Sequence, residues 1–164
     1  MRIAGIIRDS VVNGNGIRDV VFVQGCPHHC EDCHNPNTWK YDGGMEISPK
    51  ELASQFKDSP NNITISGGEP FAQWEAIVSF MYYVREYNPN KQFWIYTGYT
   101  YDEIKWYVEN YMTAYVSVIV DGRFVKSLKD PKCLYCGSSN QRLIDVPKTI
   151  KEKQIVLWEG NIDE

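Results

Sequence analysis

The sequence lacks any apolar run approaching the ~20 residues that a membrane-spanning helix needs. It also lacks an N-terminal basic segment followed by an apolar one, which a secretory signal would show. Repeats of fixed period and low-complexity linkers are absent as well. These absences predict a soluble, cytoplasmic protein that is not exported and has no membrane partner.

An excess of positive charge is also missing. The chain has 17 lysines and arginines against 21 aspartates and glutamates, giving a formal net charge of -4. The cationic residues are scattered and form no basic stripe, so direct binding of nucleic acid is not expected. A length of 164 residues suffices to bury roughly two-thirds of the unfolded surface. We therefore expect a single domain spanning residues 1–164.

Cysteine is scarce, with five residues in two tight clusters. An odd number in this arrangement does not fit a secreted disulfide framework and favours cytosolic metal or redox chemistry.

Short strand patterns alternate with helix signals along the chain. Strands are predicted at Met1–Ile7, Asp19–Gln24, Ile63–Ile65, Gln92–Tyr96 and Val116–Val120. Capping residues and apolar spacing predict helices from Ser48 to about Lys57, from Gln73 to Arg85 and from Thr100 to about Asn110. Strands separated by helices imply right-handed crossovers. The predicted fold class is α/β with a mostly parallel sheet.

Cys26, Cys30 and Cys33 follow a predicted strand and are separated by three residues and then by two. Thiolates favour zinc, copper(I) or iron–sulfur clusters. Three cysteines can hold three corners of a four-iron cubane and leave the fourth iron open to a substrate. The alternatives are buried cysteines without a ligand, or a structural zinc site completed by His28, His29 or His34.

A second motif, Gly67-Gly68-Glu69-Pro70, follows the next predicted strand. Glycines at such a position let the backbone approach a ligand closely, although a tight turn also explains them. In parallel α/β sheets the loops at the carboxyl ends of the strands converge. Both motifs are therefore expected at one site.

Together, the three-cysteine loop and the Gly67–Pro70 turn resemble the radical S-adenosylmethionine superfamily. The resemblance implies a compact, incomplete (β/α) barrel and an oxidoreductase with one oxygen-sensitive [4Fe-4S] cluster held by Cys26, Cys30 and Cys33. It further implies reductive cleavage of S-adenosylmethionine to methionine and a 5′-deoxyadenosyl radical. Asp32, Cys33 and His34 would line the cofactor pocket, with Gly67, Gly68 and Glu69 at its methionine end. His34 either lies beside the adenine or is a solvated loop histidine.

Two further stretches narrow the resemblance. Asn15–Arg18 and Val21–Cys26 look like the glycyl-radical enzyme activases. Asp121–Phe124, Leu128–Pro131 and Gly137–Arg142 resemble the activating proteins of anaerobic ribonucleoside-triphosphate reductase. This family implies a glycyl radical installed on the large reductase subunit and a reduced flavodoxin-like electron donor. Gly137–Arg142 would be part of the docking surface or a structural loop.

Two rival functions remain open. An activase for another glycyl-radical enzyme, such as pyruvate formate-lyase, is favoured by Cys33–Pro36. A zinc-stabilised binding module without catalysis is favoured by three histidines near the thiols, but it leaves the Gly67–Pro70 turn unexplained.

Cys133 and Cys136 depart from the family pattern. Such a pair is a redox dithiol, half of a zinc site that His28 or His29 would complete, or two incidental cysteines.

Overall fold

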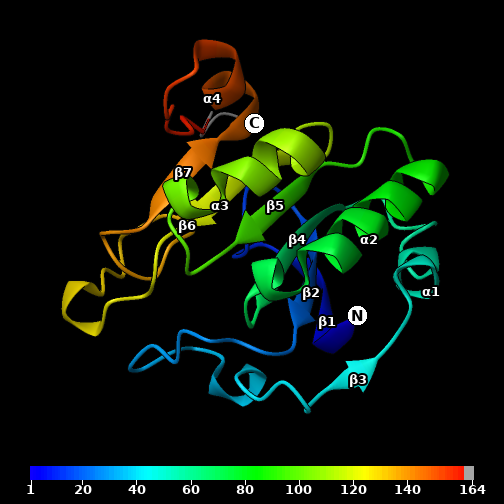
Figure 1. Cartoon of the computed structure of the whole chain (residues 1–164), viewed down its shortest axis with the longest axis horizontal. Helices are drawn as coiled ribbons and strands as arrows, with labels where there is room; N and C mark the ends of the chain where they lie inside the picture. Colours follow the sequence, from blue (N-terminus) through cyan, green and yellow to red (C-terminus); the bar gives the residue numbers. More distant parts are fainter. Residues whose placement is uncertain (161–164) are drawn as a thin grey trace.

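Seven strands form one sheet in the order β3-β1-β2-β4-β5-β6-β7 (Figure 1). The structure is a computed structural model that describes residues 1–160, so residues 161–164 of the expected single domain lie outside the described residues. The strands are β1 (Arg2–Ser10), β2 (Arg18–Val23), β3 (Met45–Glu46), β4 (Asn62–Gly67), β5 (Phe93–Tyr96), β6 (Val116–Asp121) and β7 (Arg142–Asp145).

Side-chain caps mark the starts of three of the four α-helices within residues 1–160. They are α1 (Pro49–Ser54), α2 (Trp74–Tyr87), α3 (Tyr101–Tyr107) and α4 (Val146–Glu152), and a π-helical turn at Val108–Met112 extends α3. The Ser48 hydroxyl accepts a hydrogen bond from the Glu51 N–H at 3.2 Å, and Thr100 forms a capping box with Glu103. These satisfy backbone donors at the first turns of α1 and α3. The three predicted helices are thus confirmed, whereas α4 was not predicted.

Parallel pairing is confined to the centre of the sheet. β2, β4, β5 and β6 pair in parallel, whereas β1 pairs antiparallel with β2 and β3, and β7 pairs antiparallel with β6. The connection from β1 to β2 contains no helix, and parallel neighbours need a long crossover. The α/β class is confirmed, but the sheet is mixed and open, and only its central strands fit the expected parallel arrangement.

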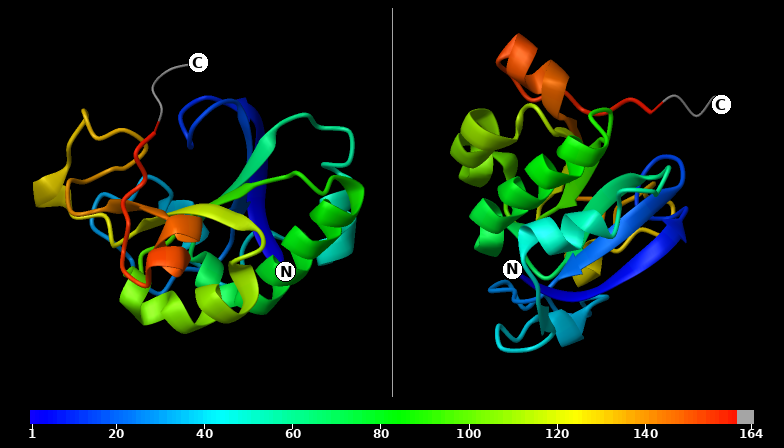
Figure 2. Two further views of the ribbon diagram at one scale, coloured as in Figure 1. Left: turned by 90° about the horizontal axis from the view of Figure 1, so that it is seen from above. Right: turned by 90° about the vertical axis from the view of Figure 1, so that its right-hand side faces the viewer.

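Successive residues of the central strands face opposite sides of the sheet. Ile63 and Ile65 of β4, with Phe93 and Ile95 of β5, belong to the main core under the helices, whereas Trp94 belongs to a separate cluster. This follows from the two-residue period of a strand. In Figure 2, left, the helices lie on one side of the sheet.

The chain returns to the face of the sheet opposite the helices near its C-terminus. Trp94 clusters there with Val118 and Val120, and the Trp158 ring lies 5.0 Å from that of Trp94. The Trp158 N–H donates to the Leu143 carbonyl at 2.8 Å, which joins the segment after α4 to β7. Figure 2, left, shows this red segment leaving the helical side. Residues 156–158 therefore complete the packing around Trp94.

Within residues 1–160, no helix combines the length and the apolarity that crossing a membrane would require.

Asp19, at the start of β2, is a buried carboxylate that joins separate segments. It accepts hydrogen bonds from Arg8 at 2.6 Å, Ser59 at 2.6 Å and Asn61 at 3.0 Å. Burial alone would raise the pKa of Asp19, but the hydrogen bonds from Ser59, Asn61 and Arg8 outweigh burial and hold the pKa below its ordinary value. Its charge therefore stabilises the fold.

A lowered folded-state pKa makes this stabilisation depend on pH. It is fully present above the unfolded-state value of about 3.9 and is lost as the pH falls through the lower folded-state pKa. Asp19→Asn should lower the free energy of unfolding by roughly 1–3 kcal/mol at pH 7. The difference from the parent should shrink below pH ~4 in urea titrations. Asp58→Asn, at a side chain 89% exposed, is the control. Parallel pH profiles for the parent and Asp19→Asn would contradict the assignment.

Candidate functional site

The loops at the carboxyl ends of β2, β4, β5 and β6 surround one cavity of about 640 Å³, here called the strand-end cavity. Its lining includes two groups of residues that were singled out in the sequence: Cys26, Cys30, Cys33, His34, Gly67 and Gly68. Loops at this edge of a sheet converge because the strands are parallel. The predicted meeting of the cysteine loop and the glycine turn is confirmed.

The three thiols of the cysteine loop meet backbone donors. The Asn35 N–H donates to the Cys33 sulfur at 3.3 Å. Burial raises the pKa of the Cys26 and Cys30 thiols, opposed at Cys26 by backbone hydrogen bonds from the loop itself. Hydrogen bonds from N–H groups to the sulfurs are among the features that set the potential of an iron–sulfur cluster. The backbone donors therefore favour thiolate ligands, whereas burial by itself opposes the thiolate form at Cys26 and Cys30.

The cysteine loop turns sharply between its thiols. Two residues of the loop, His29 and Asp32, have positive φ values of 48° and 58°, which turn the chain between the cysteines. Within residues 1–160, no three His, Cys, Asp or Glu side chains converge closely enough to hold one metal ion. A cubane needs no such convergence, because each cysteine binds a different iron.

The three histidines near the thiols have other contacts. His28 Nε2 lies 2.9 Å from Glu69 Oε2, with both side chains buried. The His29 ring lies 4.9 Å from that of Trp39, and the His34 ring 5.4 Å from that of Phe124. The arrangement gives no support to a Cys3His zinc site or to His28 completing a site with Cys133 and Cys136.

The glycine turn packs directly on the start of the cysteine loop. The Gly68 N–H donates to the Val23 carbonyl, and the Glu69 N–H to the Gly25 carbonyl, each at 2.8 Å. A Cβ atom on Gly68 would collide with the Gly25 carbonyl oxygen. Gly67 has a φ of 97°, a conformation that favours glycine. The tight-turn interpretation is therefore correct, and the same two glycines also line the strand-end cavity.

Glu69 lies beneath the cavity wall and is fully buried. Its carboxylate accepts hydrogen bonds from the Phe71 N–H at 2.9 Å, the Thr97 hydroxyl at 2.8 Å and the Gly98 N–H at 2.8 Å, in addition to its contact with His28. A carboxylate offers about four acceptor positions. Glu69 therefore joins the loops after β2, β4 and β5. The sequence did not identify His28 and Thr97 as partners of Glu69. The one available signal was that Thr97-Gly98 directly follows a predicted strand.

Asp32 is not one of the residues that line the strand-end cavity. Its carboxylate lies 3.2 Å from Lys126 Nζ, which also contacts Glu31 at 2.8 Å. These contacts join the cysteine loop to the short 3-10 turn at Lys126–Leu128. His34 is exposed at the cavity edge. The cofactor roles of these residues remain predictions.

The Gly137–Arg142 segment is fastened to the end of β6. Gln141 accepts hydrogen bonds from the Gly137 and Ser138 N–H groups at 2.8 and 3.2 Å, and donates to the Gly122 carbonyl at 2.9 Å. Arg142 pairs with the buried Asp121. The segment has a structural role, and its role in docking remains a prediction.

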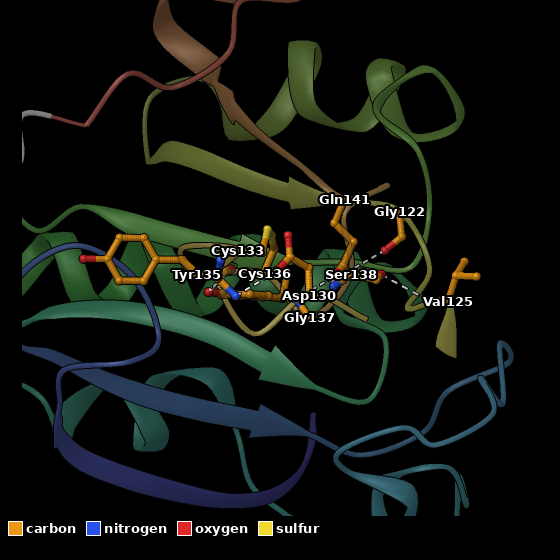
Figure 3. The surroundings of a disulfide bond; sticks show 11 residues. Gly122, Val125, Asp130, Cys133, Tyr135, Cys136, Gly137, Ser138 and Gln141 are labelled. Carbon is orange, nitrogen blue, oxygen red and sulfur yellow. Dashed lines mark hydrogen bonds between the residues drawn. A yellow bond between two sulfur atoms is a disulfide. The ribbon is translucent and has the colours of Figure 1, made fainter. Parts of the chain in front are cut away.

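Cys133 and Cys136 form a disulfide in the wall of the strand-end cavity, and Figure 3 shows them between Asp130 and Tyr135. A disulfide is compatible with the redox dithiol that was one of the three interpretations of this pair. Within residues 1–160, the remaining cysteines are the three free ones of the loop.

Comparison with known proteins places these features in a family. Residues 12–144 match the family model described as a 4Fe-4S single cluster domain. Relatives from bacteria and a phage bear the name anaerobic ribonucleoside-triphosphate reductase-activating protein. The protein from Enterobacteria phage T4 is 41% identical over 138 residues, covering 80% of this chain and 86% of the relative. The Escherichia coli K12 protein is 35% identical over 140 residues, covering 80% and 90%. The Haemophilus influenzae protein is 32% identical over 139 residues, covering 80% and 89%. The chain belongs to the 4Fe-4S single cluster domain family, together with these reductase-activating proteins.

Proposed function

We propose that this chain activates an anaerobic ribonucleoside-triphosphate reductase by radical S-adenosylmethionine chemistry. The observation that supports this best is the meeting of the three-cysteine loop and the Gly67–Gly68 turn at one cavity. The names of the relatives favour this reductase over pyruvate formate-lyase as the partner. The partner surface would belong to its large subunit, and a reduced flavodoxin-like protein would supply the electron.

Cys26, Cys30 and Cys33 would hold a [4Fe-4S] cluster with one iron left for the cofactor. Bound there, the cluster would supply the electron for reductive cleavage of S-adenosylmethionine to methionine and a 5′-deoxyadenosyl radical, and that radical would take a hydrogen atom from a glycine of the reductase. The backbone at Gly67 and Gly68 would meet the methionine end of the cofactor. His34 and the Asp32 backbone would complete the pocket.

The protein's own contribution is to orient the cofactor and exclude water. A cavity of about 640 Å³ lies within the roughly 300–1,000 Å³ common for small-molecule sites. Its base is fixed by the hydrogen bonds of Glu69 to Thr97 and Gly98. The Tyr96 hydroxyl donates to the Tyr135 carbonyl at 2.8 Å and holds the opposite wall. The reaction requires no acid–base pair from the chain, and we assign none.

The test is anaerobic reconstitution with iron and sulfide, followed by reduction and electron paramagnetic resonance spectroscopy. We expect a reduced-cluster signal that changes when S-adenosylmethionine is added, because the cofactor would bind the open iron. Mixing with the anaerobic reductase should then produce a glycyl-radical signal. A colourless protein that retains only zinc would overturn the proposal and support the non-catalytic zinc module.

A further inference from the structure

The Cys133–Cys136 pair is left unused by the proposed reaction, whose cluster ligands all lie in residues 26–33. Its two Cα atoms are 5.4 Å apart, within the usual separation for a disulfide. Both cysteines line the strand-end cavity. A bridge that can open and close would therefore lie in the wall of the cofactor site.

The two cysteines have different surroundings. Cys136 packs against the apolar cluster that contains Trp94. Cys133 lies between Lys132 and Leu134, both exposed. Both cysteines are half-buried, but only Cys136 packs against this cluster. We therefore expect an incoming thiolate to attack the sulfur of Cys133, with Cys136 as the leaving group.

Hydrogen bonds outside the bridge hold the loop in place. Asp130 accepts from the Cys133 N–H at 3.1 Å and from the Lys132 N–H at 2.9 Å. Tyr135 has a φ of 59°, its carbonyl accepts from the Tyr96 hydroxyl, and its ring meets that of Trp94 edge to face at 5.5 Å. Figure 3 shows the Tyr135 ring pointing away from Gln141 and Gly122. The loop is held by Asp130 at one end and by Tyr135 at the other. These contacts keep the reduced thiols near each other, as reversible exchange requires.

We propose that Cys133–Cys136 is a thiol–disulfide exchange site whose substrate is the dithiol of a thioredoxin-class protein. One thiolate of that protein attacks the Cys133 sulfur, the bridge breaks, and Cys136 leaves as a thiolate that takes a proton. The second thiol of the substrate then attacks the mixed disulfide and releases Cys133. Two electrons and two protons enter this chain, and the substrate dithiol becomes a disulfide.

Trapping the mixed disulfide tests the direction of attack. The reconstituted, oxidised chain is incubated with a thioredoxin whose second active-site cysteine is replaced by serine, and the adduct is located by peptide fragmentation. We expect the adduct on Cys133, at least tenfold over Cys136. Cys133→Ser, which cannot form the bridge, is the matched control and should give none. An adduct on Cys136, an adduct confined to the cluster cysteines, or no adduct would overturn the proposal.

A titration tests the pair without a protein substrate. The chain is equilibrated with mixtures of oxidised and reduced dithiothreitol, and free thiols are alkylated and counted by mass spectrometry. We expect Cys133 and Cys136 to lose their thiols together in one transition, with Cys136 remaining free in Cys133→Ser. Thiols that remain free in excess oxidant, or that react independently, would overturn the proposal. This readout needs no cofactor, so it is independent of the spectroscopic test of the proposed function.

Discussion

Replacing Cys30 by serine is expected to abolish the cluster absorbance and to reduce glycyl-radical formation on the reductase to the level of a sample without iron. A serine hydroxyl is a poor replacement for the soft thiolate that iron–sulfur clusters require. Cys30 lines the strand-end cavity with the other two loop cysteines, and the other two cysteines of residues 1–160 are paired with each other in a disulfide outside the loop. Iron and sulfide analysis after anaerobic reconstitution, followed by electron paramagnetic resonance, provides the measurement.

Cys133→Ser is the matched control for Cys30→Ser. It makes the same atomic change in the wall of the same cavity, but at a cysteine outside the cluster loop. We expect the control to retain the iron and sulfide content of the parent. If Cys133→Ser lost its iron while Cys30→Ser retained it, the assignment of cluster ligands would be wrong.

The second large effect is expected on the free energy of unfolding when Glu69 is replaced. Glu69→Leu removes the acceptor for the Phe71 and Gly98 N–H groups, the Thr97 hydroxyl and the His28 ring. A buried donor without a partner costs about 1–3 kcal/mol. Four of them amount to at least about 4 kcal/mol, against a typical total stability of about 5–15 kcal/mol. Urea unfolding of the protein without iron should show this loss.

Two variants separate the hydrogen bonds of Glu69 from other consequences of the substitution. Glu69→Gln preserves shape and one acceptor oxygen, so its loss should be about half as large. Glu86→Leu makes the same substitution at an exposed glutamate on α2 and should stay within about 0.5 kcal/mol of the parent. Equal losses for Glu69→Leu and Glu86→Leu would show that the buried carboxylate does not hold the loops together.

The parts of the site that depend on local sequence could be predicted. The Cys26–Cys33 loop follows β2 and the glycine turn follows β4, and parallel neighbours bring their carboxyl ends together. The starts of α1 and α3 could be predicted from their caps at Ser48 and Thr100. In each cap, the side chain and the backbone group that it meets are close in sequence.

The parts that depend on distant partners could not be predicted. β7 has only four residues, and its position next to β6 involves the pairing of Arg142 with Asp121, 21 positions earlier. The resemblance to the radical S-adenosylmethionine superfamily implied a place for Glu69 at the methionine end of the cofactor pocket. The burial of Glu69 depends on His28 and Thr97, which belong to other loops. Only the folded arrangement of the strands shows that these residues meet.

The wall of the strand-end cavity is assembled from both halves of the chain, and this sets an order for maturation during translation. The cysteine loop leaves the ribosome early, whereas Cys133 emerges about 100 residues later and Trp158 later still. At roughly 5–20 residues per second, the loop waits on the order of 5–20 s before the Cys133 side of its enclosure exists. Iron loaded onto the nascent chain would stay open to solvent and oxidants throughout that interval. Cluster insertion after release of the completed polypeptide avoids this exposure.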